Sequence, residues 1–307
     1  MVATIPQQVR VRVPATTANL GCGFDILGLA LQLYNTFTLS VTSDPGWRVT
    51  LPPGVSMPTN EDNLFYQAAG RLFARVGFTP TALHLSLDID IPLARGLGSS
   101  ATAVIGGLVA ANHLTGDRVD RDSLLDMAVD IEGHPDNVTP AFVGGLTLSY
   151  SKEGLQAYLP LPCAKELRFV VAIPNFALST TQARAVLPAQ VSRADAVFNS
   201  SRIALLVYAL HHQRYDLLAT AMEDRLHQPY RASLIPGMVE AIAAGKAANA
   251  LGVALSGAGP TLIALATEQE EAIAQALQEA FAQHHVVCQT RILAADTSGA
   301  VIVRTTP

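Results

Sequence analysis

A glycine-rich turn stands between the clearest strand pattern and the clearest buried-helix pattern of the chain. In residues 83–91 apolar side chains alternate with polar ones, which is the period of a half-buried strand, and Pro92 ends the pattern. Residues 99–114 are mostly small or apolar and carry no acidic residue, lysine or arginine, which is typical of a helix buried on most sides. The segment between them must turn a strand directly into a helix. Its glycines leave backbone N–H groups open at the helix N-terminus, where anions bind.

The glycines of this turn can serve a local or a chemical purpose. Ser99 and Ser100 follow Gly98 at the expected start of the helix, where a serine hydroxyl commonly caps free N–H groups. The same hydroxyls can instead face a metal–phosphate pair, beside the N–H groups that hold the phosphate. A glycine turn alone does not separate these two interpretations.

A dinucleotide-binding turn is a further interpretation of the same segment. Gly96, Gly98 and Ala101 fit the pattern G-x-G-x-x-A. That pattern also needs an acidic residue about 20 positions further on, at the end of a second parallel strand. Asp117 and Asp120 lie near that distance, but within a polar turn. The dinucleotide pattern is therefore met only in part.

Two other glycine-rich segments add polar groups. Residues 14–25 place Asn19 and Asp25 on either side of a glycine turn. An amide and a carboxylate at these positions could bind a small polar ligand, for example through its ammonium group. The same two residues are also ordinary turn formers whose side chains bond the local backbone. Residues 255–261 again supply backbone N–H groups, this time in the second half of the chain.

Composition restricts the class of partner. Half of the 307 residues are hydrophobic, 15% are charged, and the formal net charge is −5. Nucleic-acid binders and polybasic membrane binders need clustered positive charge, so we expect a small-molecule ligand, no nucleic acid and no membrane. The longest uncharged stretch, residues 247–267, contains glycines and a proline that would break a spanning helix. Three separated cysteines form no disulfide framework, and no signal-peptide pattern is visible, which together predict a cytoplasmic protein.

Strand and helix patterns are mixed without regular alternation. We expect strands near residues 9–13, 36–41, 48–51, 83–91, 146–150, 168–173, 262–266, 290–294 and 300–304. We expect helices near residues 64–76, with Asn60 as the N-cap, and near 99–114, 123–132, 192–212, 215–225, 237–250 and 268–283. This order favours an α+β fold over a doubly wound α/β fold. The glycine and prolines of residues 151–165 are typical of a domain boundary near residue 155.

The three glycine-rich segments occur in the order and form of the GHMP small-molecule kinases. The middle segment resembles their phosphate loop, P-x-x-x-G-L-G-S-S-x-A, with Thr102 in place of the final alanine. Within that superfamily, residues 18–25 (A-N-L-G-C-G-F-D) and 132–138 (E-G-H-P-D-N-V) resemble the homoserine kinase family. Cys22 stands where many relatives have proline. The resemblance runs from about residue 9 to residue 307.

This resemblance implies a fold and a reaction. The fold is the two-domain GHMP kinase fold, with a ribosomal S5 domain 2-like ATP-binding domain over residues 1–155 and a ferredoxin-like domain over residues 156–307. The reaction is transfer of the γ-phosphoryl group of ATP to the side-chain hydroxyl of L-homoserine, which makes O-phospho-L-homoserine and ADP for threonine biosynthesis. ATP and Mg²⁺ are the implied cofactors, and family habit implies a homodimer.

The resemblance also implies roles for individual residues. Ser100 and Glu132 are expected to hold Mg²⁺, a hard cation that suits oxygen ligands. The nucleotide is expected to bind Asn63 and the loop residues Pro92, Leu93, Ala94, Arg95, Gly96, Leu97, Gly98, Ser99, Ser100, Ala101 and Thr102. The amino acid is expected to bind seven polar or charged residues: Asn19, Asp25, His134, Asp136, Asn137, Arg184 and Arg231. The arginines suit its carboxylate, because a guanidinium can bond both oxygens.

The acceptor of the catalytic proton is the difficult point. Several GHMP relatives use an aspartate at the position of Asn137, and an amide cannot take a proton at neutral pH. Our hypothesis is that the proton goes to phosphate, directly or through water, while Asn137 orients the hydroxyl and Asp136 is the reserve base. Thr180 is expected beside the transferred group.

Two other functions are compatible with the same scaffold. Another GHMP kinase could act on mevalonate or on a sugar, but those acceptors lack the carboxylate and ammonium pair that Arg184, Arg231 and Asp25 suit. A noncatalytic nucleotide-binding regulator would be favoured by the loss of Ser100, Glu132 or the two arginines, and all of them are present.

Overall fold

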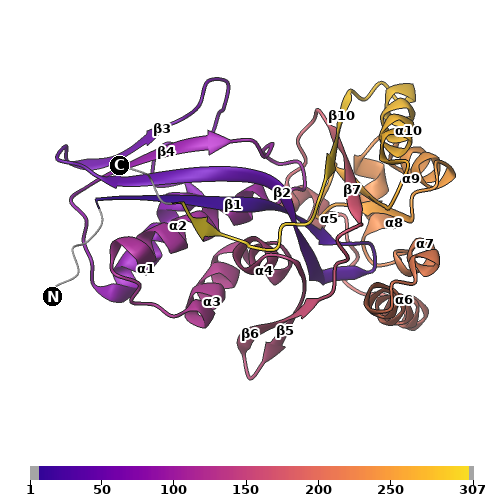
Figure 1. Ribbon diagram of the computed structural model, residues 1–307, viewed down its shortest axis with the longest axis horizontal. Coiled ribbons are helices and arrows are strands. Elements are labelled where there is room, and N and C mark those ends of the chain that lie inside the picture. Colours follow the sequence, from indigo (N-terminus) through magenta and orange to yellow (C-terminus); the bar gives the residue numbers. More distant parts are fainter. Residues whose placement is uncertain (1–6, 304–307) are drawn as a thin grey trace.

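The computed structural model describes residues 7–303, which form two β-sheets with helices packed on them (Figure 1). The larger sheet has the strand order β11-β1-β2-β4-β3, and the hairpin β5-β6 extends it from β2. Its strands are β1 (Gln8–Asn19), β2 (Gly23–Val41), β3 (Gly46–Thr50), β4 (Ala82–Ile89), β5 (Leu146–Lys152), β6 (Leu155–Leu161) and β11 (Val301–Ile302). Helices on one side of this sheet are α1 (Leu64–Val76), α2 (Ser99–Leu114), α3 (Arg121–Glu132) and α4 (Pro135–Val143).

The smaller sheet has the antiparallel order β10-β7-β9-β8. Its strands are β7 (Arg168–Pro174), β8 (Gly252–Leu255), β9 (Leu262–Ala266) and β10 (Cys288–Leu293). Between β7 and β8 lie α5 (Thr180–Ala185), α6 (Arg193–His211), α7 (Leu218–Ala221), α8 (Gln228–Arg231) and α9 (Met238–Ala247), while α10 (Glu270–Gln283) joins β9 to β10. This β-α-β-β-α-β order is the ferredoxin-like arrangement, so the expected α+β fold is confirmed.

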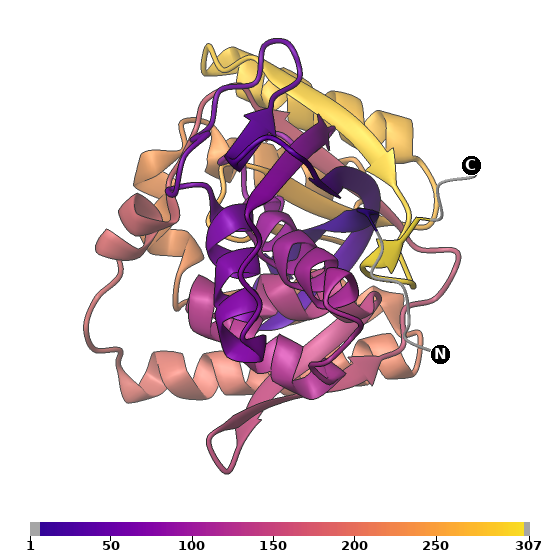
Figure 2. The same ribbon diagram turned by 90° about the vertical axis from the view of Figure 1, so that its left-hand side faces the viewer.

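The two sheets share part of one hydrophobic core. Leu27 and Leu29 of β2 belong to the same buried cluster as Phe169 and Val171 of β7 and Leu206 of α6. After β10 the chain runs back along β1, where β11 pairs in antiparallel register (Figures 1 and 2). The two sheets are therefore held together by shared hydrophobic packing as well as by the chain segments that connect them.

Local expectations at β1, α1 and α7 were wrong, each because a polar group or a register change overrides the sequence pattern. β1 does not end at Pro14; its pairing with β2 shifts register between Pro14 and Ala15, so a residue without an N–H is tolerated. The N-cap of α1 is Asn63 and not Asn60. The helix expected over residues 215–225 ends at Ala221, because the carboxylate of Asp224 accepts the N–H groups of residues 226–228.

The boundary near residue 155 stays a prediction. β6 pairs with β5 in the larger sheet, and the first strand of the smaller sheet begins at Arg168. Within residues 7–303 no helix combines the length and the apolar character that crossing a membrane requires.

Candidate active site

The turn between β4 and α2 directs its carbonyl oxygens into the protein. Ala94, Gly96 and Gly98 have positive φ angles of 53°, 77° and 67°. The carbonyl oxygens of residues 94–97 accept hydrogen bonds, in order, from Leu178 N, Thr261 N, Ser256 Oγ and Thr16 N. Within residues 7–303 no hydrogen bond uses the amide N–H groups of residues 96–99. These amides and the N-terminus of α2 together form an anion-binding site.

Close packing explains the glycines of this turn. A Cβ at Gly96 would lie 2.3 Å from the carbonyl oxygen of Ser256, and a Cβ at Gly98 would lie 1.9 Å from Thr16 Oγ1. Both separations are far shorter than any van der Waals contact, so only glycine allows the turn to rest on β1 and on the segment of residues 255–261. The N-cap of α2 is Gly98, which moves Ser99 and Ser100 into the first turn and corrects the expected serine cap.

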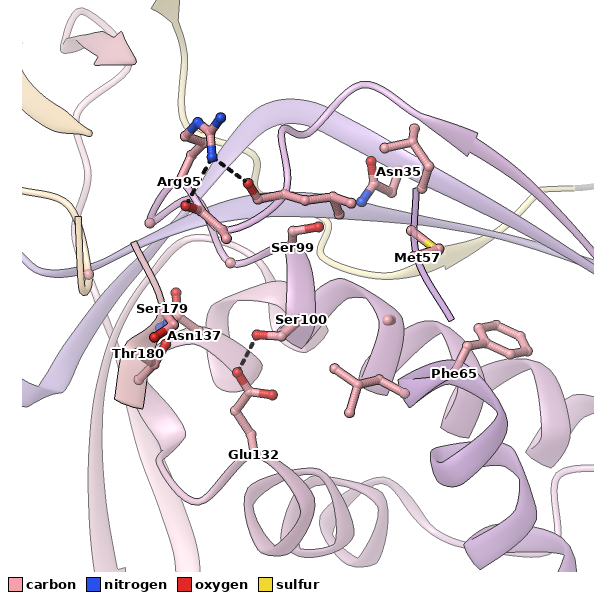
Figure 3. Close-up of a pocket in the computed structure, with 18 of the residues that line it drawn as sticks. Asn35, Met57, Phe65, Arg95, Ser99, Ser100, Glu132, Asn137, Ser179 and Thr180 are labelled. Atoms are coloured by element: carbon pink, nitrogen blue, oxygen red, sulfur yellow. Dashed lines mark hydrogen bonds between the residues drawn. The ribbon is translucent and has the colours of Figure 1, made fainter. Parts of the chain in front are cut away.

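A cavity of about 460 Å³ lies beside this turn (Figure 3). The loop residues that line it are Leu93, Ala94, Arg95, Gly96, Gly98, Ser99 and Ser100. Figure 3 shows Met57 and Phe65 on the opposite side of the cavity from Asn137, Ser179 and Thr180. Apolar side chains at one end and free amides at the other fit a molecule with a flat base and a phosphate chain.

The remaining residues that were expected to bind the nucleotide either use their polar atoms within the protein or do not line the cavity. Asn63 lines the cavity, but its Oδ1 accepts from Phe65 N and its Nδ2 donates to the carbonyl of Pro58 at 2.8 Å. Its polar atoms therefore hold the cavity wall together. Four of the expected loop residues do not line the cavity. Three of them are buried, namely Leu97, Ala101 and Thr102, and the fourth is Pro92, which is not.

Ser100 and Glu132 bring two oxygen atoms together at the edge of the cavity. Ser100 Oγ donates to Glu132 Oε1 at 2.5 Å, from the first turn of α2 to the last residue of α3 (Figure 3). Burial raises the pKa of Glu132, and the hydrogen bond from Ser100 opposes that rise only in part. No set of three or more His, Cys, Asp or Glu residues within 7–303 is arranged to hold a metal ion.

A second, smaller cavity of about 30 Å³ gathers every residue that was expected to bind the amino acid. It is lined by Asn19, Asp25, His134, Asp136, Asn137, Arg184 and Arg231, together with Phe24, Thr180, Gly257 and Ala258. Five of these residues also line the larger cavity: His134, Asn137, Thr180, Gly257 and Ala258. The two cavities therefore meet at Asn137 and Thr180, which are two of the three expected catalytic residues.

The turn that carries Asn19 and Asp25 is held in a strained conformation. Both residues have positive φ angles, 74° and 62°, which residues other than glycine adopt infrequently. Asn19 Oδ1 accepts from the N–H of Asp25, and Asn19 Nδ2 donates to the carbonyl of Gly257 at 3.1 Å. Backbone strain of this kind persists where the surroundings fix it, commonly at functional sites.

Asp25 and Arg184 form a bidentate ion pair across the small cavity. The guanidinium donates from Nη1 to Oδ2 at 3.1 Å and from Nη2 to Oδ1 at 2.7 Å. The hydrogen bond to Asp25, opposed by burial, raises the pKa of Arg184. About a third of each side chain stays exposed, 38% for Arg184 and 35% for Asp25, so both groups remain within reach of a ligand.

Arg231 is buried deeper and held by three acceptors. Its Nε donates to the carbonyl of Ala183 at 3.1 Å, and its Nη1 donates to the carbonyl of Gly257 at 3.0 Å and to His227 Nδ1 at 3.2 Å. Burial lowers the pKa of Arg231 to about 10, which leaves the guanidinium charged at neutral pH. Its Nη2 makes no hydrogen bond to residues 7–303 and is left for a ligand.

The polar residues at the start of α4 form a connected chain. His134 Nδ1 lies 2.6 Å from Asp136 Oδ1, which also accepts from Asn137 Nδ2 at 3.3 Å. Burial alone would lower the pKa of His134, but the hydrogen bond and charge of Asp136 outweigh it, so the pKa is raised and His134 is the donor. Thr16 Oγ1 donates to Asn137 Oδ1 at 2.8 Å.

Sequence reasoning missed several residues around these groups. Thr16 orients Asn137, Phe24 lines the small cavity, and His227 contacts both Arg231 and the turn of residues 19–25. His227 lies four residues before Arg231, in the segment H-Q-P-Y-R, and this proximity is the signal that could have singled it out. Thr16 lies in a strand and has no comparable signal.

Comparisons with known proteins identify the group to which this site belongs. Residues 63–145 match the model of the GHMP kinases N terminal domain, and residues 206–283 match that of the GHMP kinases C terminal domain. A homoserine kinase from Nostoc punctiforme is 43% identical over 97% of this chain and 99% of its own length. One from Moorella thermoacetica is 46% identical over 95% of this chain and 99% of its own length. The chain belongs to the homoserine kinase family of the GHMP kinases.

Solved structures agree with this membership. A crystal structure of homoserine kinase from Cytophaga hutchinsonii has a TM-score of 0.89 and 29% identity, covering 99% of each chain. A mevalonate kinase from L. major has a TM-score of 0.75 but only 16% identity over 97% of this chain and 100% of that one, so it shares the fold alone. The predicted family and the predicted two-domain GHMP kinase fold are therefore confirmed.

Proposed function

We propose that this chain transfers the γ-phosphoryl group of ATP to the side-chain hydroxyl of L-homoserine and releases ADP and O-phospho-L-homoserine, a step of threonine biosynthesis. The family membership supports this reaction. The observation that carries it is a nucleotide-sized cavity that meets a small pocket whose charged groups match a zwitterionic amino acid.

The amino-acid pocket provides a carboxylate for an ammonium group and two guanidinium groups for a carboxylate. Asp25 and Arg184 neutralise one another. The space between the lining residues is about 30 Å³. In the proposed complex, homoserine separates the pair, so that Asp25 faces its ammonium group and Arg184 and Arg231 face its carboxylate.

The same charges disfavour mevalonate or a sugar as the acceptor. Neither molecule carries an ammonium group, so Asp25 would lose its partner without gaining another, and a sugar would leave the arginines unpaired as well. An unpaired charge in a partly buried site is strongly unfavourable. A noncatalytic regulator is disfavoured because the nucleotide cavity and the amino-acid pocket share five lining residues.

Ser100 and Glu132 are the proposed Mg²⁺ ligands. Their oxygens suit a hard cation that keeps its other positions for water and phosphate oxygens. The raised pKa of Glu132 indicates a carboxylate whose charge is poorly solvated, and a bound cation would offset that charge. When bound, Mg²⁺ neutralises charge on the transferring phosphate groups. The chain itself contributes the free amides of residues 96–99, which bind and orient those groups.

The junction of the two cavities determines where the hydroxyl meets the phosphate. Thr180 and Asn137 line both cavities, so an amino acid held by the arginines would direct its hydroxyl toward them. Asp136 Oδ1 already accepts hydrogen bonds from His134 and Asn137. This engagement supports the proposal that the hydroxyl proton leaves to phosphate and that Asn137 orients the nucleophile.

The reaction can be tested by following its products directly. Incubation of the protein with ATP, Mg²⁺ and L-homoserine should produce phosphorus NMR signals of a phosphate monoester and of ADP in equal amounts. Omission of L-homoserine is the control. ADP formed together with free phosphate, and no monoester, would show that water is the acceptor and would contradict the proposed reaction.

We further propose a homodimer in the cytoplasm, with the division between the two domains near residue 155. These proposals rest on family habit, on the cysteine pattern and on the residues around position 155. Light scattering on the purified protein tests the dimer, because a mass near the 32.4 kDa of one chain would contradict it.

A further inference from the structure

A fully buried imidazole connects the two sides of the amino-acid pocket. His227 has no exposed surface, and its ring stacks on Phe24 with a centroid separation of 4.9 Å. Its Nε2 lies 2.8 Å from the carbonyl oxygen of Gly21, in the turn that carries Asn19 and Asp25. Its Nδ1 lies 3.2 Å from Nη1 of Arg231.

These contacts determine where the proton of His227 resides. The carbonyl oxygen of Gly21 can only accept, so Nε2 must carry the hydrogen. A guanidinium can only donate, so Nδ1 must present its lone pair to Arg231. A proton on Nδ1 would place two donors and two positive charges face to face. Burial lowers the pKa of His227, and the charge of Asp224 opposes that shift only in part, which agrees with a neutral ring.

Asp224 fixes the backbone from which His227 projects. Its carboxylate accepts the N–H groups of Leu226, His227 and Gln228 at 2.7–2.9 Å, and Asn199 Nδ2 at 2.8 Å. Asn199 Nδ2 also lies 3.4 Å from the carbonyl of Cys22, in the same turn that His227 contacts. The imidazole is thereby held between two segments that are far apart in the sequence.

We propose that His227 is a positioning residue: as the neutral Nε2–H tautomer, it holds Nη1 of Arg231 and so directs the free Nη2 of that arginine at the carboxylate of the bound amino acid. The role rests on the proposed function, since it concerns the same pocket. His227 itself touches no substrate in this role. It acts on the carboxylate end of the substrate and not on the ammonium or hydroxyl ends.

Removal of the substrate carboxylate provides the test. The amine 3-amino-1-propanol keeps the ammonium and hydroxyl groups of homoserine but lacks its carboxylate. In His227→Ala we expect kcat/KM for L-homoserine to fall about 10-fold to 100-fold, as for a lost hydrogen bond to a charged group. The inhibition constant of 3-amino-1-propanol and the KM for ATP should stay within about twofold of the parent values, the margin expected where no interaction is lost.

Two further variants separate positioning from general destabilisation. His227→Asn keeps an acceptor near the position of Nδ1 and should recover part of the lost kcat/KM. Asn112→Ala removes another buried polar side chain, which forms hydrogen bonds with Val119 far from the pocket. It should lower the melting temperature without changing kcat/KM for L-homoserine relative to the inhibition constant of 3-amino-1-propanol. Parallel weakening of homoserine and 3-amino-1-propanol in His227→Ala, or no loss for homoserine, would overturn the proposal.

A direct measurement remains decisive if His227→Ala does not fold. Nitrogen NMR of the parent protein with labelled histidine should give a protonated Nε2 and an unprotonated Nδ1 for His227, assigned by the loss of its signals in His227→Asn. A protonated Nδ1 near neutral pH would overturn the inference. If instead the parent protein does not phosphorylate homoserine at all, the proposed function fails, and the nitrogen spectrum still tests the tautomer.

Discussion

The ion pair between Asp25 and Arg184 leads to a prediction in which substrate affinity and stability change by different amounts. Asp25→Asn keeps the shape of the side chain and removes its charge. The substrate ammonium then loses a charge-assisted hydrogen bond, which contributes about 1.5–3 kcal/mol. Arg184 no longer has to be separated from a carboxylate, which returns up to about 1 kcal/mol because the pair is about one-third exposed. The net loss is about 0.5–3 kcal/mol, so KM for L-homoserine should rise about 2-fold to 150-fold.

The same substitution should have little effect on folding. A pair with this exposure stabilises the fold by at most about 1 kcal/mol, which corresponds to a change in melting temperature of less than about 4 °C. A coupled ADP-release assay gives KM for both substrates, and a thermal melt gives the stability.

A matched control and a clear refutation are available for this prediction. Asp216→Asn breaks another bidentate pair, with Arg214 at 2.8 and 2.7 Å, which is exposed and lines neither cavity. It should leave both KM values unchanged. An unchanged KM for homoserine in Asp25→Asn, or an equal rise in KM for ATP, would show that Asp25 does not face the amino acid.

Four further outcomes follow from the structure. Gly98→Ala puts a Cβ 1.9 Å from Thr16 Oγ1 at a φ of 67°. The free energy of unfolding should therefore fall by at least about 1 kcal/mol, and kcat/KM for ATP should fall as well. An unchanged midpoint of urea unfolding would contradict this expectation. Glu132→Gln should raise the Mg²⁺ concentration for half-maximal activity about 10-fold or more, whereas an unchanged Mg²⁺ titration would remove Glu132 from the metal site. Asp136→Asn should lose less than the roughly 10²-fold in kcat that a general base supplies, and a larger loss with homoserine affinity intact would identify Asp136 as the base. Burial lowers the pKa of His227, so the unfolded chain binds a proton at this residue more readily than the folded chain does. The free energy of unfolding in urea should therefore decrease as the pH falls below about 6.5, and it should decrease less in His227→Asn. The same dependence of this free energy on pH in both proteins would contradict the expectation.

The fold could be predicted from the sequence where local patterns and tertiary packing agree. The helix of residues 99–114 was predicted with its observed ends, because an uncharged apolar run bounded by glycines has few alternatives. The first strand was predicted too short, because a proline normally stops a strand and only the register shift against β2 allows Pro14 to lie inside one. That shift depends on a partner strand and has no signal in the first strand itself.

The site divides in a similar way. Charged and amide side chains in recognisable motifs were predicted, and all seven line one cavity. The motifs did not predict which hydrogen bonds and ion pairs these side chains form in the folded chain. Asp25 and Arg184 are 159 positions apart, so their pairing depends on how α5 lies against the glycine turn, and Thr16 and Asn137 are 121 positions apart. Long-range hydrogen bonds of this kind are consequences of topology.

Acceptor selectivity is the property that the proposed pocket determines most directly. The measurement is kcat/KM from ADP release with ATP, Mg²⁺ and each of L-homoserine, L-serine, mevalonate and galactose. The paired charges of Asp25, Arg184 and Arg231 predict turnover with L-homoserine, and with L-serine at least 10-fold lower, since its hydroxyl is one methylene shorter. Mevalonate and galactose should give no turnover above background. Turnover with mevalonate or galactose and none with L-homoserine would contradict the proposed substrate, and no turnover with any acceptor would favour a noncatalytic nucleotide-binding protein.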